Sequence, residues 1–134
     1  MSETARVLLY SSDANVRRDV RVALGKQVAP DLPEIEVVEV ATHPEVFRQL
    51  DAGGYALAIL DGEANPAGGI GIAYQIKEEL DSPPPVLLLV VRVADAWLAT
   101  WSRAEAVAPL PIDPLKLPGQ VAQLLRLSQP QVNA

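Results

Sequence analysis

The residues in this sequence with the clearest chemical potential are a few carboxylates and hydroxyls that directly follow apolar segments. Asp61 follows one such segment, and Ser11, Ser12 and Asp13 follow another, Val7–Tyr10. A carboxylate in such a place can hold a hard cation, or it can cap the helix that comes next. Serine hydroxyls there can bind an anion at a helix N-terminus, but more often they satisfy the first backbone N–H groups of the helix.

Other familiar reaction centres have little support. The chain has no cysteine, which excludes disulfides, thiolate metal sites and cysteine nucleophiles. His43 is the single histidine, and beside Pro44 at the start of an expected helix it should face solvent, so we expect neither a transition-metal site nor a Ser–His–Asp arrangement. Gly68, Gly69 and Gly71 lack the Lys and Ser/Thr of a P-loop and indicate a flexible turn.

The composition sets further limits on the fold and on the partners. The chain has 134 residues, 49% hydrophobic and 21% charged, which suits one domain with one core. A net charge of -6 argues against nucleic acid as a partner, because phosphate binding needs a concentrated positive field. Met1–Arg6 is too polar for a signal peptide, and the longest apolar run, Val86–Val91, is too short to cross a bilayer. We therefore expect a soluble cytoplasmic protein that does not insert into a membrane.

Five short apolar segments predict five strands, each buried on both faces of a sheet. They are Val7–Tyr10, Ile35–Val40, Ala56–Leu60, Val86–Val91 and Ala106–Leu110. Because segments with helical spacing separate them, we expect an α/β fold with a single doubly wound (βα)5 domain, in which a five-stranded parallel sheet carries helices on both faces. In such sheets the working site lies beyond the C-terminal ends of the strands, which is where Ser11 and Asp61 stand.

Capping residues and apolar periodicity place the helices between these strands. Thr42 and Glu45 have the spacing of a capping box at the start of the second helix. A fourth helix is expected from about Asp95 to Arg103. The last helix opens either at Asp113 or, because proline disfavours a helix interior, at Pro118.

The order of the segments, the length of the chain and the stretch Tyr55–Gly69 resemble the receiver domains of two-component response regulators. So does Leu110-Pro111-Ile112-Asp113-Pro114, which matches the family's Lys-Pro-x-Asp-Pro segment except at its first position. The resemblance covers almost the whole chain. It implies a flavodoxin-like receiver domain over residues 1–127, followed by a polar C-terminal tail over residues 128–134.

The resemblance also carries over the positions of the family's phosphorylation switch, most of which are degenerate in this chain. Two acidic Mg²⁺ ligands fall on Ser11 and Ser12, the phosphoryl acceptor on Asp61, the Thr/Ser position on Val90, the aromatic position on Val107 and the Lys position on Leu110. Only Asp61 keeps the family's residue type. The loop after it also departs, since Asn65 stands where the family has Pro and Pro66 follows.

Each loss damages the switch in a definite way. Serines cannot replace two carboxylates as ligands of Mg²⁺, so that Asp61 and neighbouring Asp13 would be left as weak candidates to hold the ion. Without a cation, the charge that develops during phosphoryl transfer is not neutralised. We therefore expect no catalytic residue, no enzymatic activity and no cofactor. Mg²⁺ would be needed only if Asp61 is a working acceptor, and the interpretation that we favour is that Asp61 is a remnant or caps the following helix.

Trp97 and Trp101 are the only tryptophans and lie four residues apart, so they share one side of the expected fourth helix. They could pack into the core beside Leu98. In the family, however, the position of Trp101 usually carries an exposed polar residue, and tryptophan is enriched at binding hot spots. The fourth helix, fifth strand and fifth helix form the family's usual partner face, so a partner interface at Trp97 and Trp101 is equally open.

Three functions follow from these observations. The first is a pseudo-receiver that binds a protein partner independently of phosphorylation. The chain resembles in particular the small, atypical stand-alone receivers of actinobacteria, a group linked to the respiratory NADH dehydrogenase. That resemblance alone implies a large respiratory assembly as partner, which would bring the chain to the cytoplasmic face of the membrane. The alternative is a functional phosphoacceptor in a two-component phosphorelay that uses Asp61. The third is a ligand-binding domain of flavodoxin-like shape, for which only Ser11, Ser12 and the glycines after Asp61 offer phosphate-binding groups.

Overall fold

The computed structural model describes residues 4–64, 68–91 and 101–128 of the chain. All five predicted strands are present, each within two residues of its expected bounds. The elements are β1 (Ala5–Tyr10), α1 (Ala14–Leu24), β2 (Ile35–Val40), α2 (His43–Ala52), β3 (Tyr55–Asp61), α3 (Gly69–Glu79), β4 (Val86–Val90), β5 (Ala106–Pro109) and α5 (Leu117–Ser128). Most of the predicted fourth helix, residues 95–100, lies outside the described residues; Trp101 and Ser102 are helical.

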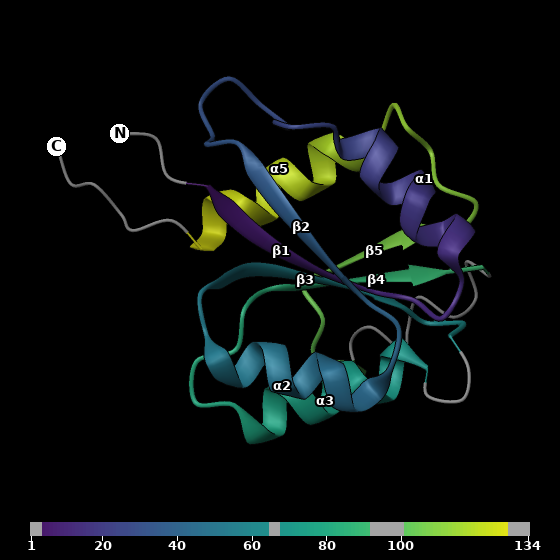
Figure 1. The fold of residues 1–134 in the computed structure, drawn as a ribbon, viewed down its shortest axis with the longest axis vertical. Coiled ribbons are helices and arrows are strands. Elements are labelled where there is room, and N and C mark those ends of the chain that lie inside the picture. The colour runs from purple at the N-terminus through teal and green to yellow at the C-terminus, as the bar shows by residue number, and fades with distance from the viewer. Residues whose placement is uncertain (1–3, 65–67, 92–100, 129–134) are drawn as a thin grey trace, which may run out of the picture.

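The five strands form one parallel sheet in the order β2-β1-β3-β4-β5. Figure 1 shows α1 and α5 on one face of this sheet and α2 and α3 on the other. The expected doubly wound fold is therefore confirmed. No helix among the described residues is long and apolar enough to cross a membrane.

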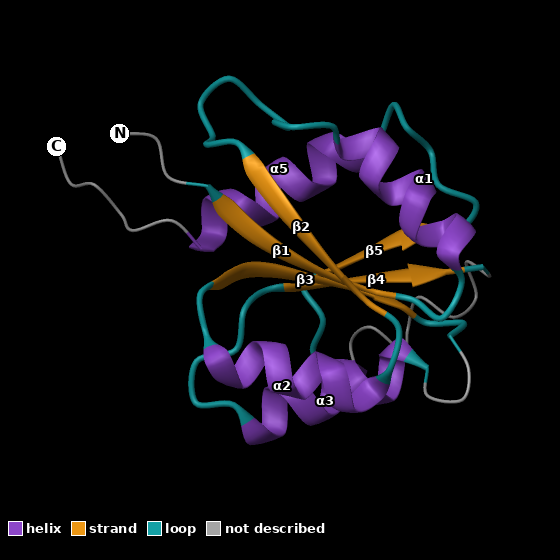
Figure 2. Ribbon diagram, viewed as in Figure 1, coloured by secondary structure: helices purple, strands orange, loops and turns teal. Residues whose placement is uncertain are grey.

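Alternate residues of each strand enter opposite layers of the core, because side chains along a strand point to opposite faces. Leu57 and Ile59 of β3 pack in the cluster that includes Val20 of α1 and Val121 of α5. Their neighbour Leu60 packs in the other cluster, with residues of α2 and α3 (Figure 2). Both layers need apolar residues, which explains why the strands are continuous apolar runs rather than alternating ones.

The structure corrects the predicted capping box of α2. Thr42 is the N-cap, but its side chain makes no capping hydrogen bond. The Glu45 carboxylate instead accepts a hydrogen bond from the Gln49 side chain over 2.9 Å and pairs with Arg48, one turn further along the helix. These side-chain donors compete with the backbone N–H groups for the same carboxylate.

The last helix begins at Leu117, next to the second of its two predicted starts. Asp113 forms the turn before it: its carboxylate accepts the Leu115 N–H over 2.9 Å, and its carbonyl accepts the Leu117 N–H over 3.0 Å. Pro118 is thus the second residue of α5, where a missing N–H breaks no helical hydrogen bond.

Two polar contacts hold α3 in place, one to α2 and one to the sheet. His43 is half-buried rather than facing solvent, because its Nε2 lies 2.9 Å from the Gln75 side-chain oxygen and its ring packs edge-on against Phe47. Lys77 of α3 donates to Glu105 over 2.9 Å, and Glu105 also accepts the Val86 N–H over 2.7 Å. The Lys77–Glu105 pair therefore joins α3 to the starts of β4 and β5.

Candidate functional site

Ser11 and Asp61 lie side by side at the C-terminal edge of the sheet. Tyr10 of β1 pairs with Leu60 of β3, so that the residue after Tyr10 meets the residue after Leu60. Both side chains are buried: Ser11 has no exposed surface and Asp61 is 3% exposed. The register of the parallel sheet thus brings together two residues that the sequence places fifty positions apart.

Both oxygens of the Asp61 carboxylate accept hydrogen bonds from the protein. Ser11 Oγ donates to Oδ2 over 2.7 Å, and the backbone N–H of Glu63 donates to Oδ1 over 2.8 Å. The turn after Asp61 is also tied to the neighbouring strand, because the Gly62 N–H donates to the Leu89 carbonyl over 2.8 Å. Hydrogen bonds to an ionised carboxylate are among the stronger ones in proteins, so this arrangement fixes the side chain in place.

Ser11 also organises the start of α1. Its Oγ accepts the backbone N–H of Asp13 over 3.0 Å, and its carbonyl accepts a hydrogen bond from the Arg17 guanidinium over 2.6 Å. Arg17 in turn pairs with Glu39 of β2 at 3.2 Å. The Asp13 carboxylate caps α1 by accepting the Asn15 N–H over 2.8 Å. Ser11 and Asp13 therefore both make the helix-start contacts that serine and aspartate favour in such places.

The groups at this edge do not fit a Mg²⁺ ion. Mg²⁺ requires oxygen ligands in near-octahedral geometry, at least one or two of them carboxylates. At the junction of β1 and β3, both oxygens of the Asp61 carboxylate already accept hydrogen bonds, from Ser11 and from Glu63. Across the described ranges, no group of three or more His, Cys, Asp or Glu side chains is placed to hold a metal ion.

The degenerate positions 90, 107 and 110 carry apolar side chains that pack into the core. Val90, at the end of β4, is buried among the side chains of the α2–α3 layer, and Val107 packs against the same layer. Leu110 packs against the α1–α5 layer and is followed by a cis Leu110–Pro111 peptide bond. Within residues 4–64, 68–91 and 101–128, no lysine or arginine forms an ion pair with Asp61.

Three contributors to the site were not foreseen from the sequence: Tyr10, Arg17 and Glu63. The pKa of Tyr10 is raised, first by burial of its hydroxyl and then by the negative charge of Asp61. Arg17 lies one helical turn after Asp13, a spacing that could have placed it at the strand end. Glu63 acts through its backbone N–H, which no side-chain pattern could indicate.

Trp101 lies on the surface, 52% exposed, and stacks on Tyr74 of α3 with ring centroids 4.6 Å apart and planes inclined by 15°. Tyr74 is itself 38% exposed, and the Arg103 guanidinium lies 5.4 Å from the centre of its ring. Arg103 also pairs with Glu78. We call Tyr74, Trp101 and Arg103 the aromatic surface. Trp97, the other predicted member, lies outside the described residues.

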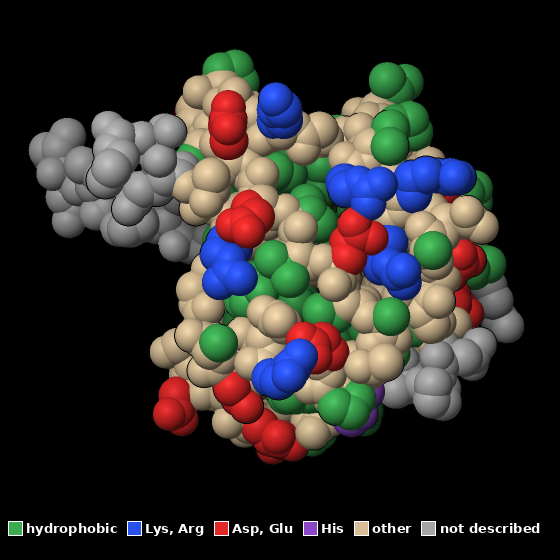
Figure 3. All heavy atoms as spheres, in the orientation of Figure 1, with side chains coloured by type: hydrophobic (Ala, Val, Ile, Leu, Met, Phe, Trp, Pro, Cys, Tyr) green, Lys and Arg blue, Asp and Glu red, His purple; other side chains and the backbone are tan. Residues whose placement is uncertain are grey.

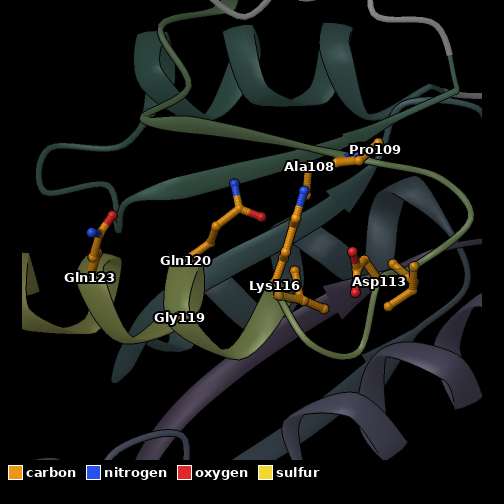
Figure 4. A pocket seen from close by; sticks show the side chains of 9 residues that line it. Ala108, Pro109, Asp113, Lys116, Gly119, Gln120 and Gln123 are labelled. Carbon is orange, nitrogen blue, oxygen red and sulfur yellow. The ribbon is translucent and has the colours of Figure 1, made fainter.

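A groove of about 490 Å³ runs between β5 and α5, away from the site (Figure 4). Its floor is apolar, with Ala108 and Leu117, and Gln120 and Gln123 project from α5 along it. Gln120 donates to the Val107 carbonyl over 3.0 Å. Among the described residues, neither Asp61 nor any aromatic residue lines this groove, so they do not supply the stacking groups that a flavin or nucleotide site needs.

We compared the sequence of the chain with those of known proteins. No protein-family model matches the chain. Two proteins of Mycobacterium tuberculosis, one from strain CDC 1551 and one from strain H37Rv, are each named an uncharacterized response regulatory protein. Each is 56% identical to this chain over 125 residues, covering 93% of the chain and 94% of the relative.

Solved structures of receivers have the same fold. The signal receiver domain of a Vibrio parahaemolyticus protein aligns with a TM-score of 0.79 at 20% identity, covering 94% of this chain and 93% of that one. The chemotaxis response regulator CheY4 of Vibrio cholerae aligns with a TM-score of 0.76 at 16% identity, covering 91% and 99%. The receiver domain of Francisella response regulator 1452 aligns with a TM-score of 0.79 at 13% identity, covering 94% and 100%. At these identities the likeness concerns the fold alone.

Proposed function

This chain belongs to the response-regulator receiver family, and we propose that it acts there as a protein-binding module whose binding does not depend on phosphorylation. The observation that carries the proposal is the closed environment of Asp61. Its two carboxylate oxygens are occupied by Ser11 Oγ and the Glu63 N–H, and the side chain is almost completely buried. An acceptor must present an oxygen to a phosphoryl group in line with the leaving oxygen, which this arrangement disfavours.

The missing electrostatics support the same proposal. Phosphoryl transfer to a carboxylate brings two anions together, and catalysis of that step rests on cations placed beside them. Here Ser11 takes the place of one acidic metal ligand and Leu110 the place of the lysine. Val90 also lacks the hydroxyl group through which the family's Thr or Ser responds to a bound phosphoryl group. The function that remains for the fold is then to present a binding surface to a protein partner.

The aromatic surface is the part of the molecule that best suits a partner. Exposed tryptophan and tyrosine supply large, rigid contact areas at little cost in conformational entropy, and both are enriched at hot spots. Stacking holds Trp101 against Tyr74, so the pair is ordered before a partner arrives. Preorganisation of this kind lowers the entropic cost of binding.

The partner that we propose is a large respiratory assembly, the NADH dehydrogenase, and its only support is the resemblance to atypical actinobacterial receivers. The test is capture from native lysate, membrane fraction included, with the wild type, Asp61→Asn and Trp101→Ala as baits, and mass spectrometry of the captured proteins. We expect the wild type and Asp61→Asn to capture one assembly in equal, stoichiometric amounts, and Trp101→Ala to capture much less. Loss of capture by Asp61→Asn would contradict the proposal.

A second function, phosphoacceptance in a phosphorelay, is favoured by one observation: Asp61 still ends β3 at the C-terminal edge of the sheet. Incubation with acetyl phosphate and Mg²⁺, followed by intact-mass measurement, separates the two functions. The matched positive control is the variant Ser11→Asp, Ser12→Asp, Val90→Thr, Leu110→Lys, which restores the family's residue types at the metal-ligand, Thr/Ser and Lys positions. We expect no added phosphoryl mass on the wild type; labelling at Asp61 would favour the phosphorelay instead.

A further inference from the structure

The two helical layers of the domain differ in charge. In the α2–α3 layer, residues 42–54, 68–85 and 101–105 carry six acids against three cations, a net charge of -3. In the α1–α5 layer, residues 11–34 and 110–128 carry five acids against six cations, a net charge of +1. Of the two helical faces of the sheet, the α2–α3 face is therefore the negative one.

Half of the acids in the α2–α3 layer have no cation beside them. Three of the six form ion pairs, namely Glu45–Arg48, Glu78–Arg103 and Glu105–Lys77. The other three, Asp51, Glu79 and Asp81, are exposed and form no ion pair within the described part of the chain. We call these three residues the acidic end. Their charges are not neutralised by the protein, so a cation from a partner is attracted to them.

The acidic end lies where α2 and α3 both end. Helices that connect parallel strands run opposite to them, so the C-terminal ends of α2 and α3 lie at the same edge of the sheet (Figure 1). Asp51 is in the last turn of α2, and Glu79 is the last residue of α3. Figure 3 shows Asp and Glu side chains gathered at this corner, at the lower left of the view. The partial negative charge of the two helix C-termini adds to that of the carboxylates.

A hollow of about 190 Å³ opens between the two helix ends. Asp51 and Asp81 line it, together with Tyr55 and Ser82. The hollow is smaller than the sites that usually hold a small-molecule ligand, and its size suits a single side chain. A lysine or arginine head group placed there meets two carboxylates, one from α2 and one from the turn after α3.

The aromatic surface adjoins the acidic end along α3. Tyr74 and Glu78 lie four residues apart on one side of the helix, and Asp81 follows three residues later. Between Tyr74 and Glu79 the helix axis rises by about 8 Å, at roughly 1.5 Å per residue. One short segment of a partner can therefore reach both the aromatic surface and the acidic end.

The aromatic surface already holds a cation of the chain itself. The Arg103 guanidinium lies 5.4 Å from the centre of the Tyr74 ring and pairs with Glu78. Arg103 has a left-handed backbone (φ 64°), a conformation that favours glycine, so these side-chain contacts compensate for a strained residue. The Trp101 ring, which stacks on Tyr74 and is half exposed, offers a second aromatic group to a cation from outside.

We propose that this side of α3 binds a basic segment of the protein partner. One Arg or Lys side chain of the segment lies on the exposed part of the Trp101 ring, and further cations pair with the acidic end. The inference rests on the proposed binding function and adds the chemistry of the partner to it. The net charge of -3 in this layer repels an acidic segment, so the surface selects its partner by the sign of its charge.

The probe is a set of three designed peptides of equal length that differ only in carrying arginine, glutamine or glutamate at the same positions. Amide chemical shifts of the ¹⁵N-labelled chain locate the binding, and titration gives the Kd. We expect the arginine peptide to shift amides of residues 51–54 and 74–81 and the indole N–H of Trp101. It should bind about tenfold or more tightly than the glutamate peptide at low salt, and added salt should reduce that difference.

The double variant Asp51→Asn, Asp81→Asn should weaken binding of the arginine peptide by about three- to tenfold, because it removes both carboxylates from the hollow. Its matched control is Asp19→Asn, Glu34→Gln, which removes two exposed acids from the α1–α5 layer and changes the net charge equally. Trp101→Leu keeps an apolar side chain and should weaken the arginine peptide by about two- to fivefold, since the cation–π contact is lost. All these positions are exposed, so each variant should keep the wild-type spectrum outside its own site.

Three results would overturn the inference: equal or tighter binding of the glutamate or glutamine peptide, shifts confined to other parts of the chain, or equal effects of the double variant and its control. Failure of all three peptides to bind would overturn it too. Each of these results leaves the proposed function standing, because none of them involves phosphorylation. A change in the Kd of the arginine peptide after treatment of the chain with acetyl phosphate and Mg²⁺ would instead contradict the proposed function.

Discussion

Replacing Ser11 with alanine should destabilise the fold because it removes the side-chain donor to a buried carboxylate. Ser11 Oγ lies 2.7 Å from Asp61 Oδ2, and neither side chain has appreciable contact with water. A hydrogen bond to a charged group contributes about 1.5–3 kcal/mol. The same hydroxyl accepts the Asp13 N–H at the start of α1, which is only part-buried and adds about 0.5–1 kcal/mol.

Together these contacts predict that Ser11→Ala lowers the free energy of unfolding by about 2–4 kcal/mol. For a domain of this size, that corresponds to a Tm lower by roughly 6–16 °C. Urea unfolding followed by circular dichroism gives the free energy directly. Ser82→Ala, at an exposed serine between α3 and β4, is the control and should change stability by less than about 0.5 kcal/mol.

A double-mutant cycle isolates the hydrogen bond from the helix-start contact. In the Asp61→Ala background no buried carboxylate is left to satisfy, so Ser11→Ala should cost only about 0.5–1 kcal/mol there. The difference between the two backgrounds is the coupling energy, which we expect to be about 1.5–3 kcal/mol. An equal cost of Ser11→Ala in both backgrounds would refute the view that Ser11 holds Asp61.

Three further predictions follow from polar contacts elsewhere. Lys77→Met should lower stability by about 1–2 kcal/mol in chemical unfolding, because the mostly buried Lys77 ammonium group donates to both Glu105 and the Pro84 carbonyl. Arg48→Met, at a more exposed pair, should change stability by less than about 0.5 kcal/mol, and similar costs for the two variants would contradict this view. Burial raises the pKa of Tyr10 and of Tyr55, so in a Tyr74→Phe variant absorbance at 295 nm should show no tyrosine that ionises at or below its ordinary pKa of about 10. The stability that the neutral hydroxyls contribute should be lost as pH rises through the raised pKa values. Ionisation of either tyrosine at its ordinary pKa would refute this prediction. The Arg126 guanidinium lowers the pKa of Asp31, so their ion pair stabilises the fold above the ordinary aspartate pKa of about 4, and that stability is lost as pH falls through the lowered pKa. Asp31→Asn should therefore flatten the acid side of a plot of stability against pH. An unchanged plot would show that the ion pair contributes nothing.

The fold could be predicted from the sequence because its signals are local and repeated. Each strand, such as Val86–Val90, is a short apolar run, because a strand buried on both faces needs apolar side chains at nearly every position. The pairing of Ser11 with Asp61 could be anticipated as well, since parallel strands bring their C-terminal ends to one edge. Their hydrogen bond could not, because it depends on the register of β1 against β3 to within one residue.

Other features depend on contacts between segments that no local pattern reveals. Trp101 is exposed on one side and stacked on the other because Tyr74 of α3 lies beneath it. The carboxylate of Glu45 leaves its expected capping role because Arg48 and Gln49 compete for it. The half-burial of His43 likewise follows from Gln75 on another helix. In each case a side chain had several possible partners, and tertiary packing selected one of them.

The most direct test of phosphorylation-independent binding is the affinity of the captured partner for three forms of the chain: wild type, wild type incubated with acetyl phosphate and Mg²⁺, and Asp61→Asn. Asp61→Asn keeps the size of the side chain and an oxygen that can accept from Ser11 or Glu63, so it removes the acceptor with little change in packing. We predict Kd values that agree within about twofold across the three, since a factor of two is only about 0.4 kcal/mol. A tenfold or larger difference between Asp61→Asn and the wild type, or on treatment with the phosphodonor, would show that Asp61 still controls binding.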